Sequence, residues 1–206
     1  MDGTLLDLYF DEYFWGHLVP EKYAEKHNIT FGAAKELLFK IYRSHEKTLK
    51  WTDLDFWSRE FHLDIPALTE QIKHLIEVHP HVIDFLKMMK KHRKKVILVT
   101  NAHYKAINIK LKKTQIGGYF DSVLCSFDTG YPKESIEFWH KAERLLKFDK
   151  EKTLFIDDTE DVLKTAKEYG IRYLLFKAGA NSKAKPKESK EFRVINDFRQ
   201  LMKEER

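Results

Sequence analysis

The sequence contains a single cysteine, Cys125, and one thiol excludes a disulfide within the 206 residues. Cys125 lies in the apolar run SVLCSF with no implied base beside it, so we interpret it as a buried structural thiol rather than a nucleophile. Long apolar runs are also missing, because none approaches the roughly 18 residues of a membrane span. The first residues include Asp2, Asp7, Asp11 and Glu12, whereas a secretory signal begins with basic residues. We therefore expect a cytoplasmic protein without a membrane anchor.

Acidic residues are slightly outnumbered, because 37 Lys and Arg against 32 Asp and Glu give a net charge of +5. A basic balance suits either nucleic acid or a small anionic substrate. The excess is concentrated at residues 87–95, which resemble the end of a helix, and at 177–190, which resemble a solvated loop. No aromatic residues alternate with these lysines, as stacking on bases would require. We therefore expect a small-molecule substrate and no nucleic-acid partner.

Short apolar runs alternate with helical patterns in the second part of the chain. The runs lie at 96–100, 119–127, 153–158 and 173–176, and the helical patterns at 104–113, 134–147 and 160–169. This alternation predicts an α/β fold with a Rossmann-like parallel sheet. The last segment, VINDFRQLMKEE, has a helical period and predicts a closing helix.

Residues 9–78 carry their apolar residues at helical rather than alternating spacing. Thr30 can cap a helix and Pro20 can begin one, and we expect about four helices in this segment. The chain is long enough for one core domain with such an insertion. We therefore assign residues 1–8 and 79–206 to the α/β core, and residues 9–78 to an inserted α-helical cap.

Four polar features lie at or just beyond the ends of predicted strands. They are Asp2-Gly3-Thr4, Thr100-Asn101, Lys133 and Asp157-Asp158. Open parallel sheets build their sites at the carboxyl ends of strands. Taken singly, each feature is as well explained by a turn, a helix cap or a surface lysine. Together, hydroxyls and a lysine form a phosphate cradle, and paired carboxylates suit Mg²⁺. The set therefore predicts phosphoryl transfer with electrostatic stabilisation.

The order of these features resembles that of a known family. A receiver domain of signalling proteins uses a similar set of residues, but with the acidic pair first and the lysine last. MDGTLLD, LVTNA, YPK and FIDD, with a helical insert after the first, resemble the haloacid dehalogenase superfamily of phosphatases. DLYFDEYFWGHLVPEK, TLKWTDLDFWS, VTNAHY, GYPKE and TLFIDDTE resemble its GMP/IMP nucleotidase branch. The resemblance covers residues 1 to about 176.

The resemblance implies a role for each motif residue. Asp2 would protonate the leaving oxygen and then activate water. Thr100 and Asn101 would hold the phosphoryl oxygens, and Lys133 would stabilise the nucleophile and the phosphate. These roles together imply a phosphatase.

The resemblance also implies a Mg²⁺ site. Asp158 would ligate the ion with Asp157 beside it, and the backbone carbonyl of Asp2 would complete the protein ligands. Haloacid dehalogenases themselves need no metal and lack the residue that matches Asp2. The presence of Asp2 therefore favours a Mg²⁺-dependent phosphatase.

The attacking aspartate of the first family motif would occupy the position before Met1. The strand that leads into this motif, central in the sheet of the family, is likewise not among the 206 residues. Losing a central strand would leave unpaired backbone groups on both its neighbours. We therefore expect Met1 to be an internal methionine, the middle residue of an Asp-Met-Asp motif. We also expect the 206 residues alone to be poorly folded and without phosphatase activity.

The helical insert would cover the site, exclude water and select the leaving group. Among its aromatic residues, Trp51 and Phe10 are the candidates for substrate contact, although Phe10, Phe14 and Leu18 at a spacing of four also fit helix packing. We predict a phosphohydrolase that acts on purine nucleoside 5′-monophosphates through an aspartyl-phosphate. The alternatives are a sugar-phosphate phosphatase or phosphomutase of the same superfamily, and a truncated non-catalytic protein that binds a phosphate ligand.

Overall fold

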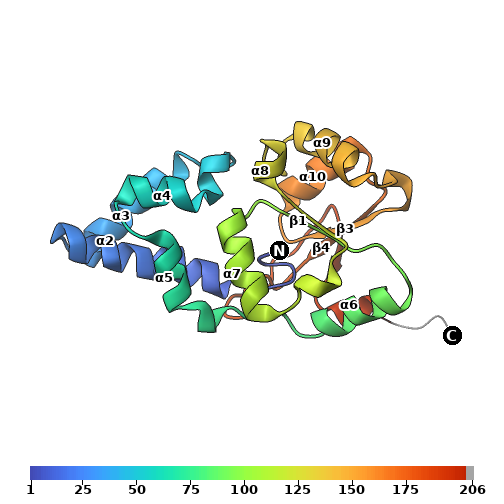
Figure 1. Ribbon diagram of the computed structural model, residues 1–206, viewed down its shortest axis with the longest axis horizontal. Helices are drawn as coiled ribbons and strands as arrows, with labels where there is room; N and C mark the ends of the chain where they lie inside the picture. The colour runs from blue at the N-terminus through green and yellow to red at the C-terminus, as the bar shows by residue number, and fades with distance from the viewer. Residues whose placement is uncertain (203–206) are drawn as a thin grey trace.

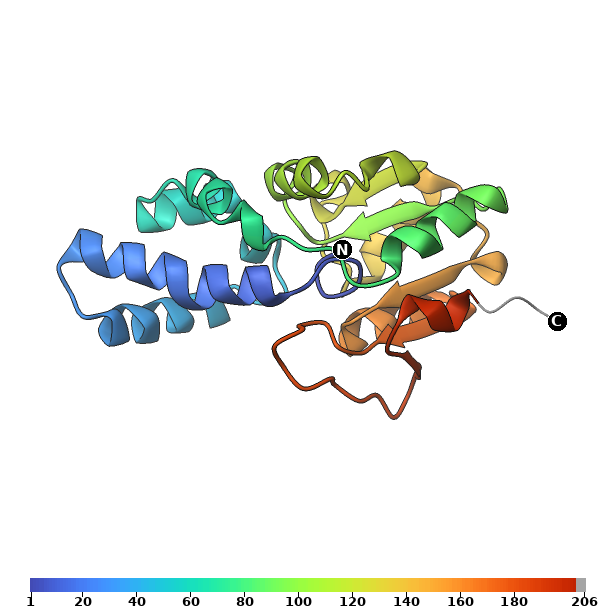
Figure 2. The same cartoon turned by 90° about the horizontal axis from the view of Figure 1, so that it is seen from below.

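The computed structural model of the protein describes residues 1–202. It has an α/β part and an elongated helical part, and the N-terminus lies between the two (Figures 1 and 2). Among the described residues, no helix is both long and apolar enough to cross a membrane.

The strands of the α/β part are all parallel and form two sheets. β1 (Ile97–Thr100) pairs with β2 (Ser122–Cys125), while β3 (Leu154–Asp157) pairs with β4 (Tyr173–Lys177), which also pairs with β5 (Arg193–Ile195). The strand orders are β1-β2 and β3-β4-β5. Within residues 1–202, β1 and β3 therefore each have one edge that no named strand pairs.

Five helices belong to this part of the chain. They are α6 (Val82–Lys91), α7 (Tyr104–Thr114), α8 (Ser126–Thr129), α9 (Ile136–Leu146) and α10 (Glu160–Tyr169). Short 3₁₀ turns occupy Gly117–Tyr119 and Lys150–Lys152.

The same helices cover both sheets. Val99 of β1 and Phe155 of β3 pack into one hydrophobic cluster with residues of α9 and α10. Leu98 of β1 and Ile156 of β3 join a second cluster, which contains residues of α6 and α7. Because neighbouring residues of a strand point to opposite faces, the two sheets form one layer between two layers of helices. This arrangement confirms the predicted α/β fold.

The helical part contains four helical segments. The first runs without interruption through α1 (Tyr9–Tyr13), a π-helical turn (Phe14–Leu18) and α2 (Val19–His27). It is followed by α3 (Phe31–Arg43), a 3₁₀ turn (Leu49–Thr52), α4 (Leu54–Phe61), α5 (Ile65–Gln71) and a 3₁₀ turn (Lys73–Leu75). Thr30 caps α3 as predicted, because its hydroxyl accepts a hydrogen bond from Ala33 N at 3.2 Å.

Pro20 lies in the first turn of α2, as predicted. Leu18 and Val19 before it have helical backbone angles, so α2 continues without a break from the π-helical turn at Phe14–Leu18. The start of α2 is therefore a change of helix type within one continuous helical segment rather than a new helix after a loop.

The predicted C-terminal helix was wrong. Its first residues form β5, because Val194 and Ile195 pair with the free edge of β4. A single 3₁₀ turn (Phe198–Leu201) follows, capped by Asp197, which accepts a hydrogen bond from Arg199 N at 2.7 Å. Residues 203–206 of the predicted helix lie outside the described part of the chain. Similarly, the end of the predicted strand at 119–127 forms α8.

The two connections between the helical and α/β parts lie side by side. Leu6 and Val78 form an antiparallel bridge, and His79 N donates to Leu5 O at 2.9 Å. The carbonyl of Ala180, beyond β4, accepts from Leu8 N at 2.8 Å and lies 3.2 Å from His79 Nε2. Both connections are therefore attached to the same segment of the α/β part.

Candidate active site

The Asp2-Gly3-Thr4 segment forms a tight loop against Asp158, the residue after β3. Thr4 Oγ1 donates to Asp158 Oδ1 at 2.8 Å, and Met1 O accepts from Leu5 N at 2.8 Å. Gly3 has a φ of +73°, and a Cβ atom added there would lie 2.2 Å from Asp158 Oδ2. The sequence needs glycine at this position both for its left-handed backbone and for the close approach of the carboxylate.

We expect Gly3→Ala to destabilise the fold by at least about 1 kcal/mol, because the left-handed backbone and the contact with Asp158 both oppose a Cβ atom. The Asp158 side chain would also move away from the loop, so Mg²⁺ affinity should fall. Chemical denaturation with and without Mg²⁺ measures both effects. Gly32→Ala is the control, since no atom lies within 4 Å of its added Cβ. Equal stability of the two variants would contradict this interpretation.

Lys133 and Asp157 form a buried ion pair, with Lys133 Nζ 2.5 Å from Asp157 Oδ2. Burial by itself would lower the pKa of Lys133, but the adjoining carboxylate of Asp157 outweighs it and raises the pKa. The other oxygen of Asp157 accepts from Thr159 N at 3.1 Å, and Trp139 Nε1 donates to Lys133 O at 2.9 Å. Lys133 is therefore a fixed, charged group beside the acidic pair.

Thr100 and Asn101 end β1 and connect it to the Lys133 loop. Asn101 Oδ1 accepts from Lys133 N at 2.8 Å, and Asn101 Nδ2 donates to Glu134 at 2.8 Å. Thr100 is buried, and its hydroxyl accepts from Ala102 N at 3.1 Å. The four predicted features thus meet at one edge of the sheet layer, because hydrogen bonds and ion pairs link them in sequence from Asn101 through Lys133 and the acidic pair to Thr4.

Lys110, which the sequence patterns did not identify, forms an ion pair with the carboxylate of Asp2. Its Nζ lies 2.8 Å from Asp2 Oδ1 and 2.7 Å from Asp11 Oδ1, and its side chain is 3% exposed. The contact with Asp2 is an ion pair rather than an aligned hydrogen bond, so Asp2 Oδ1 has no hydrogen-bond partner among the described residues. The sequence could have indicated that Lys110 is buried, because helical spacing places it on the same face of α7 as the apolar residues Ala106 and Ile107.

Lys110 contacts the carboxyl groups of both Asp2 and Asp11, but their pKa values shift in opposite directions. Burial by itself would raise the pKa of Asp2, but Lys110 outweighs it and lowers that pKa. Burial and the nearby Asp2 charge raise the pKa of Asp11 to about 6. Asp11 belongs to α1, so this charge cluster connects the start of the helical insert to the Asp2 loop.

The raised pKa of Asp11 predicts a pH dependence of stability. An aspartate with an ordinary pKa of 3.8 and a folded-state pKa of about 6 binds more protons in the folded state between these values. Its stabilising contribution is complete below the lower value and is lost as the pH rises through the higher one. Asp11→Asn should remove this component, so its stability should change less between pH 4 and pH 6. Urea denaturation at several pH values tests this, and parallel curves for the two proteins would count against it.

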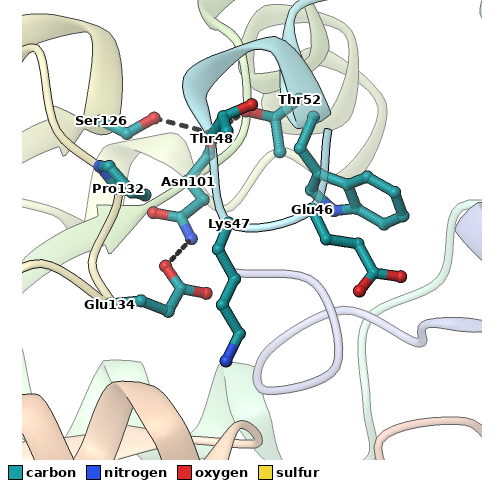
Figure 3. Close-up of a pocket in the computed structure, with 9 residues that line it drawn as sticks. Glu46, Lys47, Thr48, Thr52, Asn101, Ser126, Pro132 and Glu134 are labelled. Carbon is teal, nitrogen blue, oxygen red and sulfur yellow. Dashed lines mark hydrogen bonds between the residues drawn. The ribbon is translucent and has the colours of Figure 1, made fainter. Parts of the chain in front are cut away.

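The two aromatic candidates lie in different surroundings. Phe10 is buried in the hydrophobic core, where Lys110 Nζ lies 5.1 Å from the centre of its ring and Phe14 stacks on it at 6.0 Å. Trp51 is 41% exposed and lines a cavity of about 190 Å³ between the helical insert and the core. Asn101 lines the same cavity (Figure 3).

Asp158 suits a hard divalent cation. Only its Oδ1 has a hydrogen-bond partner among the described residues, which leaves Oδ2 free beside the glycine loop. Burial and the neighbouring charge of Asp157 raise the pKa of Asp158, so an added positive charge would stabilise its ionised form. Carboxylate and carbonyl oxygens are the ligands that Mg²⁺ prefers. The residues present therefore fit the predicted ion.

A second cluster of possible metal ligands, Asp53, Asp55 and His103, joins the insert to the core. Asp53 Oδ1 caps α4 and lies 3.7 Å from His103 Nε2, while Asp55 Oδ1 lies 2.5 Å from Lys105 Nζ. These carboxylates already have partners. The cluster therefore holds the insert against the core, as does Thr52 Oγ1, which donates to Asn101 O at 2.6 Å.

Comparison with known proteins agrees with this geometry. The chain matches the haloacid dehalogenase-like hydrolase family over residues 1–170. It is 39% identical over 202 residues to the GMP/IMP nucleotidases YrfG of Escherichia coli and of Shigella flexneri, an alignment that spans 98% of this chain and 91% of each relative.

Solved structures show the same fold at lower identity. A HAD phosphatase from Thermococcus onnurineus superposes with a TM-score of 0.82 at 22% identity, over 98% of this chain and 93% of that one. A β-phosphoglucomutase, described as putative, from Thermotoga maritima superposes with a TM-score of 0.69 at 17% identity, over 98% and 94% of the two chains. The order of the motifs, the parallel sheet layer with its helical insert and the family match agree, and the chain belongs to the haloacid dehalogenase-like hydrolases.

Proposed function

We propose that the protein is a Mg²⁺-dependent phosphohydrolase of purine nucleoside 5′-monophosphates, with residues 9–78 as its cap. The observation that carries this proposal is the set of linked residues at the sheet edge. Lys133 pairs with Asp157, and Thr4 of the Asp2 loop donates to the neighbouring Asp158. The 39% identity to GMP/IMP nucleotidases supports the nucleotide as substrate. The single buried thiol, Cys125, suits the reducing cytoplasm that we propose as its location.

Each residue of the set has a role that follows from its position. Lys133 and the second amide N–H of Asn101 would hold the phosphoryl oxygens, because a hydrogen bond holds the Lys133 loop against Asn101, beside the acidic pair. Asp158 Oδ2 and the carbonyl of Asp2 would ligate Mg²⁺, while Asp157 orients Lys133. Bound Mg²⁺ neutralises charge on the phosphoryl group. Asp2, oriented by Lys110, would in its protonated form give its proton to the leaving oxygen, and the carboxylate so formed would then accept a proton from the attacking water.

The position directly before Met1 would face this set. Met1 is buried, and the charged groups near its backbone nitrogen include Lys133, Asp157 and Asp158. A preceding aspartate would thus lie beside both the lysine and the metal ligands. We propose that this residue is the nucleophile that forms the aspartyl-phosphate. We further propose that the strand leading into it pairs with the free edges of β1 and β3.

The test compares two chains that carry an apolar strand upstream of Met1. In the first the strand ends in aspartate directly before Met1, and in the second it ends in asparagine. The aspartate chain should release phosphate from GMP and IMP only with Mg²⁺, whereas the asparagine chain and the 206 residues alone should not. Faster release from sugar phosphates would favour a sugar-phosphate phosphatase. Absence of release from any phosphate monoester by the aspartate chain would refute the enzyme proposal.

A further inference from the structure

The cavity beside the candidate active site is formed by the helical insert and the core together. Its lining residues are Glu46, Lys47, Thr48, Trp51 and Thr52 from the insert, and Asn101, Ser126, Pro132 and Glu134 from the core. Asn101 belongs both to this cavity and to the linked set around Lys133. Under the proposed function, a substrate whose phosphate lies at that set would extend its leaving group into the cavity.

Most polar side chains that line the cavity already have partners. The hydroxyls of Thr52 and Ser126 both donate to Asn101 O, and Thr48 Oγ1 donates to His45 O at 2.7 Å. The remaining paired groups are two cross-links: Asn101 Nδ2 with Glu134, and Lys47 Nζ with Asp161 at 2.6 Å. Each of these groups therefore has at least one partner within the protein.

Glu46 is different, because its carboxylate has no hydrogen bond or ion pair with any residue of the described chain. In Figure 3, Glu46 lies on the opposite side of the cavity from the hydrogen-bonded pair of Asn101 and Glu134. Glu46 is exposed, and the segment that carries it is held to the core on both sides, through Lys47 and Asp161 and through Thr52 and Asn101. The cavity thus presents a free group that can only accept hydrogen bonds.

Trp51 supplies an aromatic surface in the same cavity. Its ring packs edge-on against Tyr42, with 6.3 Å between the ring centres, and the residue remains 41% exposed. Stacking on an aromatic side chain is tolerant of base identity because every base has a π-face. Stacking therefore accounts for binding of a purine but not for discrimination between purines.

The chemistry of the free carboxylate provides that discrimination. A 6-oxopurine carries a hydrogen on N1, and guanine adds an amino group on C2 beside it, so both present donors to an acceptor. Adenine has an unprotonated N1 and only a C–H at C2, so a carboxylate facing the N1 and C2 side of the base would meet a second acceptor, while the amino group of adenine lies on C6, on the other side of N1. A site that hydrogen-bonds one ligand rejects an analogue that leaves its polar group unpaired. We propose that Glu46 accepts hydrogen bonds from this edge and selects guanine and hypoxanthine nucleotides over adenine nucleotides while Trp51 stacks on the base.

This inference rests on the proposed function, and nucleotide binding without turnover tests it. The upstream-extended chain with asparagine before Met1 is titrated calorimetrically with GMP, IMP, AMP and ribose 5-phosphate in Mg²⁺. We expect GMP and IMP to bind at least about 10-fold more tightly than AMP, as one charged hydrogen bond implies. Ribose 5-phosphate should bind more weakly than GMP.

Three variants separate the contributions. Glu46→Gln should bring the GMP and AMP affinities together, because an amide can also donate to adenine N1. Glu36→Gln is the matched control, since Glu36 lies on α3 and pairs with Lys40 in solvent. Trp51→Ala should weaken all three purine nucleotides by a similar factor, about 5- to 150-fold, and leave ribose 5-phosphate unchanged.

The outcomes distinguish the two proposals. If the extended chain binds no phosphate monoester, the proposed function fails and the role of Glu46 fails with it. If GMP binds but Glu46→Gln keeps the ratio of GMP to AMP affinity of the unsubstituted chain, the role of Glu46 is refuted while the proposed function stands. Equal binding of GMP and ribose 5-phosphate would likewise refute base recognition in this cavity.

Discussion

Lys110→Met is expected to lower the free energy of unfolding by about 3–5 kcal/mol at pH 7. Methionine fills the space of the lysine stem but leaves the carboxylates of Asp2 and Asp11 buried without a counter-charge. Removing one partner of a buried ion cluster costs more than the cluster itself contributes, because the remaining charges stay out of water. Urea denaturation of the substituted and unsubstituted chains gives the difference directly.

Two further variants make this expectation specific. Lys40→Met removes an exposed pair with Glu36 and should change stability by no more than about 0.5 kcal/mol. Adding Asp11→Asn to Lys110→Met should restore part of the lost stability, because it removes one of the two buried charges. A loss in Lys110→Met no larger than that in Lys40→Met would show that the cluster is not essential to the fold.

Asp158→Asn should reduce Mg²⁺-dependent phosphate release by about 10³-fold or more in the chain that carries the upstream aspartate. Asparagine keeps the size of the side chain and the oxygen that accepts from Thr4, but it lacks the charge that would hold the ion. Mg²⁺ affinity, measured by calorimetry, should fall together with activity. Chelation of Mg²⁺ should reduce the activity of the unsubstituted chain to a similar level.

Asp149→Asn is the control for this substitution. Asp149 has an exposed side chain that caps the 3₁₀ turn Lys150–Lys152. This turn precedes the start of β3, whereas Asp158 follows the end of that strand. The control should retain the activity of the unsubstituted chain. Full Mg²⁺-dependent activity in Asp158→Asn would remove that residue from the metal site.

The sequence by itself determined the fold class, the helical insert and the order of the motif residues. Strands such as Ile97–Thr100 are short apolar runs, and helices such as Glu160–Tyr169 have an apolar period, so both elements follow from local pattern. The motif residues could be predicted because parallel strands end at one edge of a sheet, which places Asn101 and Asp158 near one another. Lys133 lies in the loop after α8, where a hydrogen bond to Asn101 brings it to the same edge.

Errors arose where a local signal competed with a contact distant in sequence. The C-terminal segment has a helical period, but Val194 pairs with β4 instead. The free edge of β4 supplies hydrogen-bond partners for backbone groups that, at the ends of a short surface helix, would bond only to water. Pro20 does lie in the first turn of α2, but packing of Phe10, Phe14 and Leu18 in one hydrophobic core makes α2 continuous with the helical turns before it, which the sequence did not predict.

Only the tertiary structure decided which polar residues act together. Lys110 and Asp11 are 99 positions apart in the sequence, and neither carries a motif, yet they meet at Asp2. Glu46 carries no motif either, and its place in the cavity beside Trp51 is what distinguishes it from the other acidic residues of the insert. The charge, hydrogen bonds and burial that give such residues a role come from groups distant in sequence, and the fold alone brings those groups together.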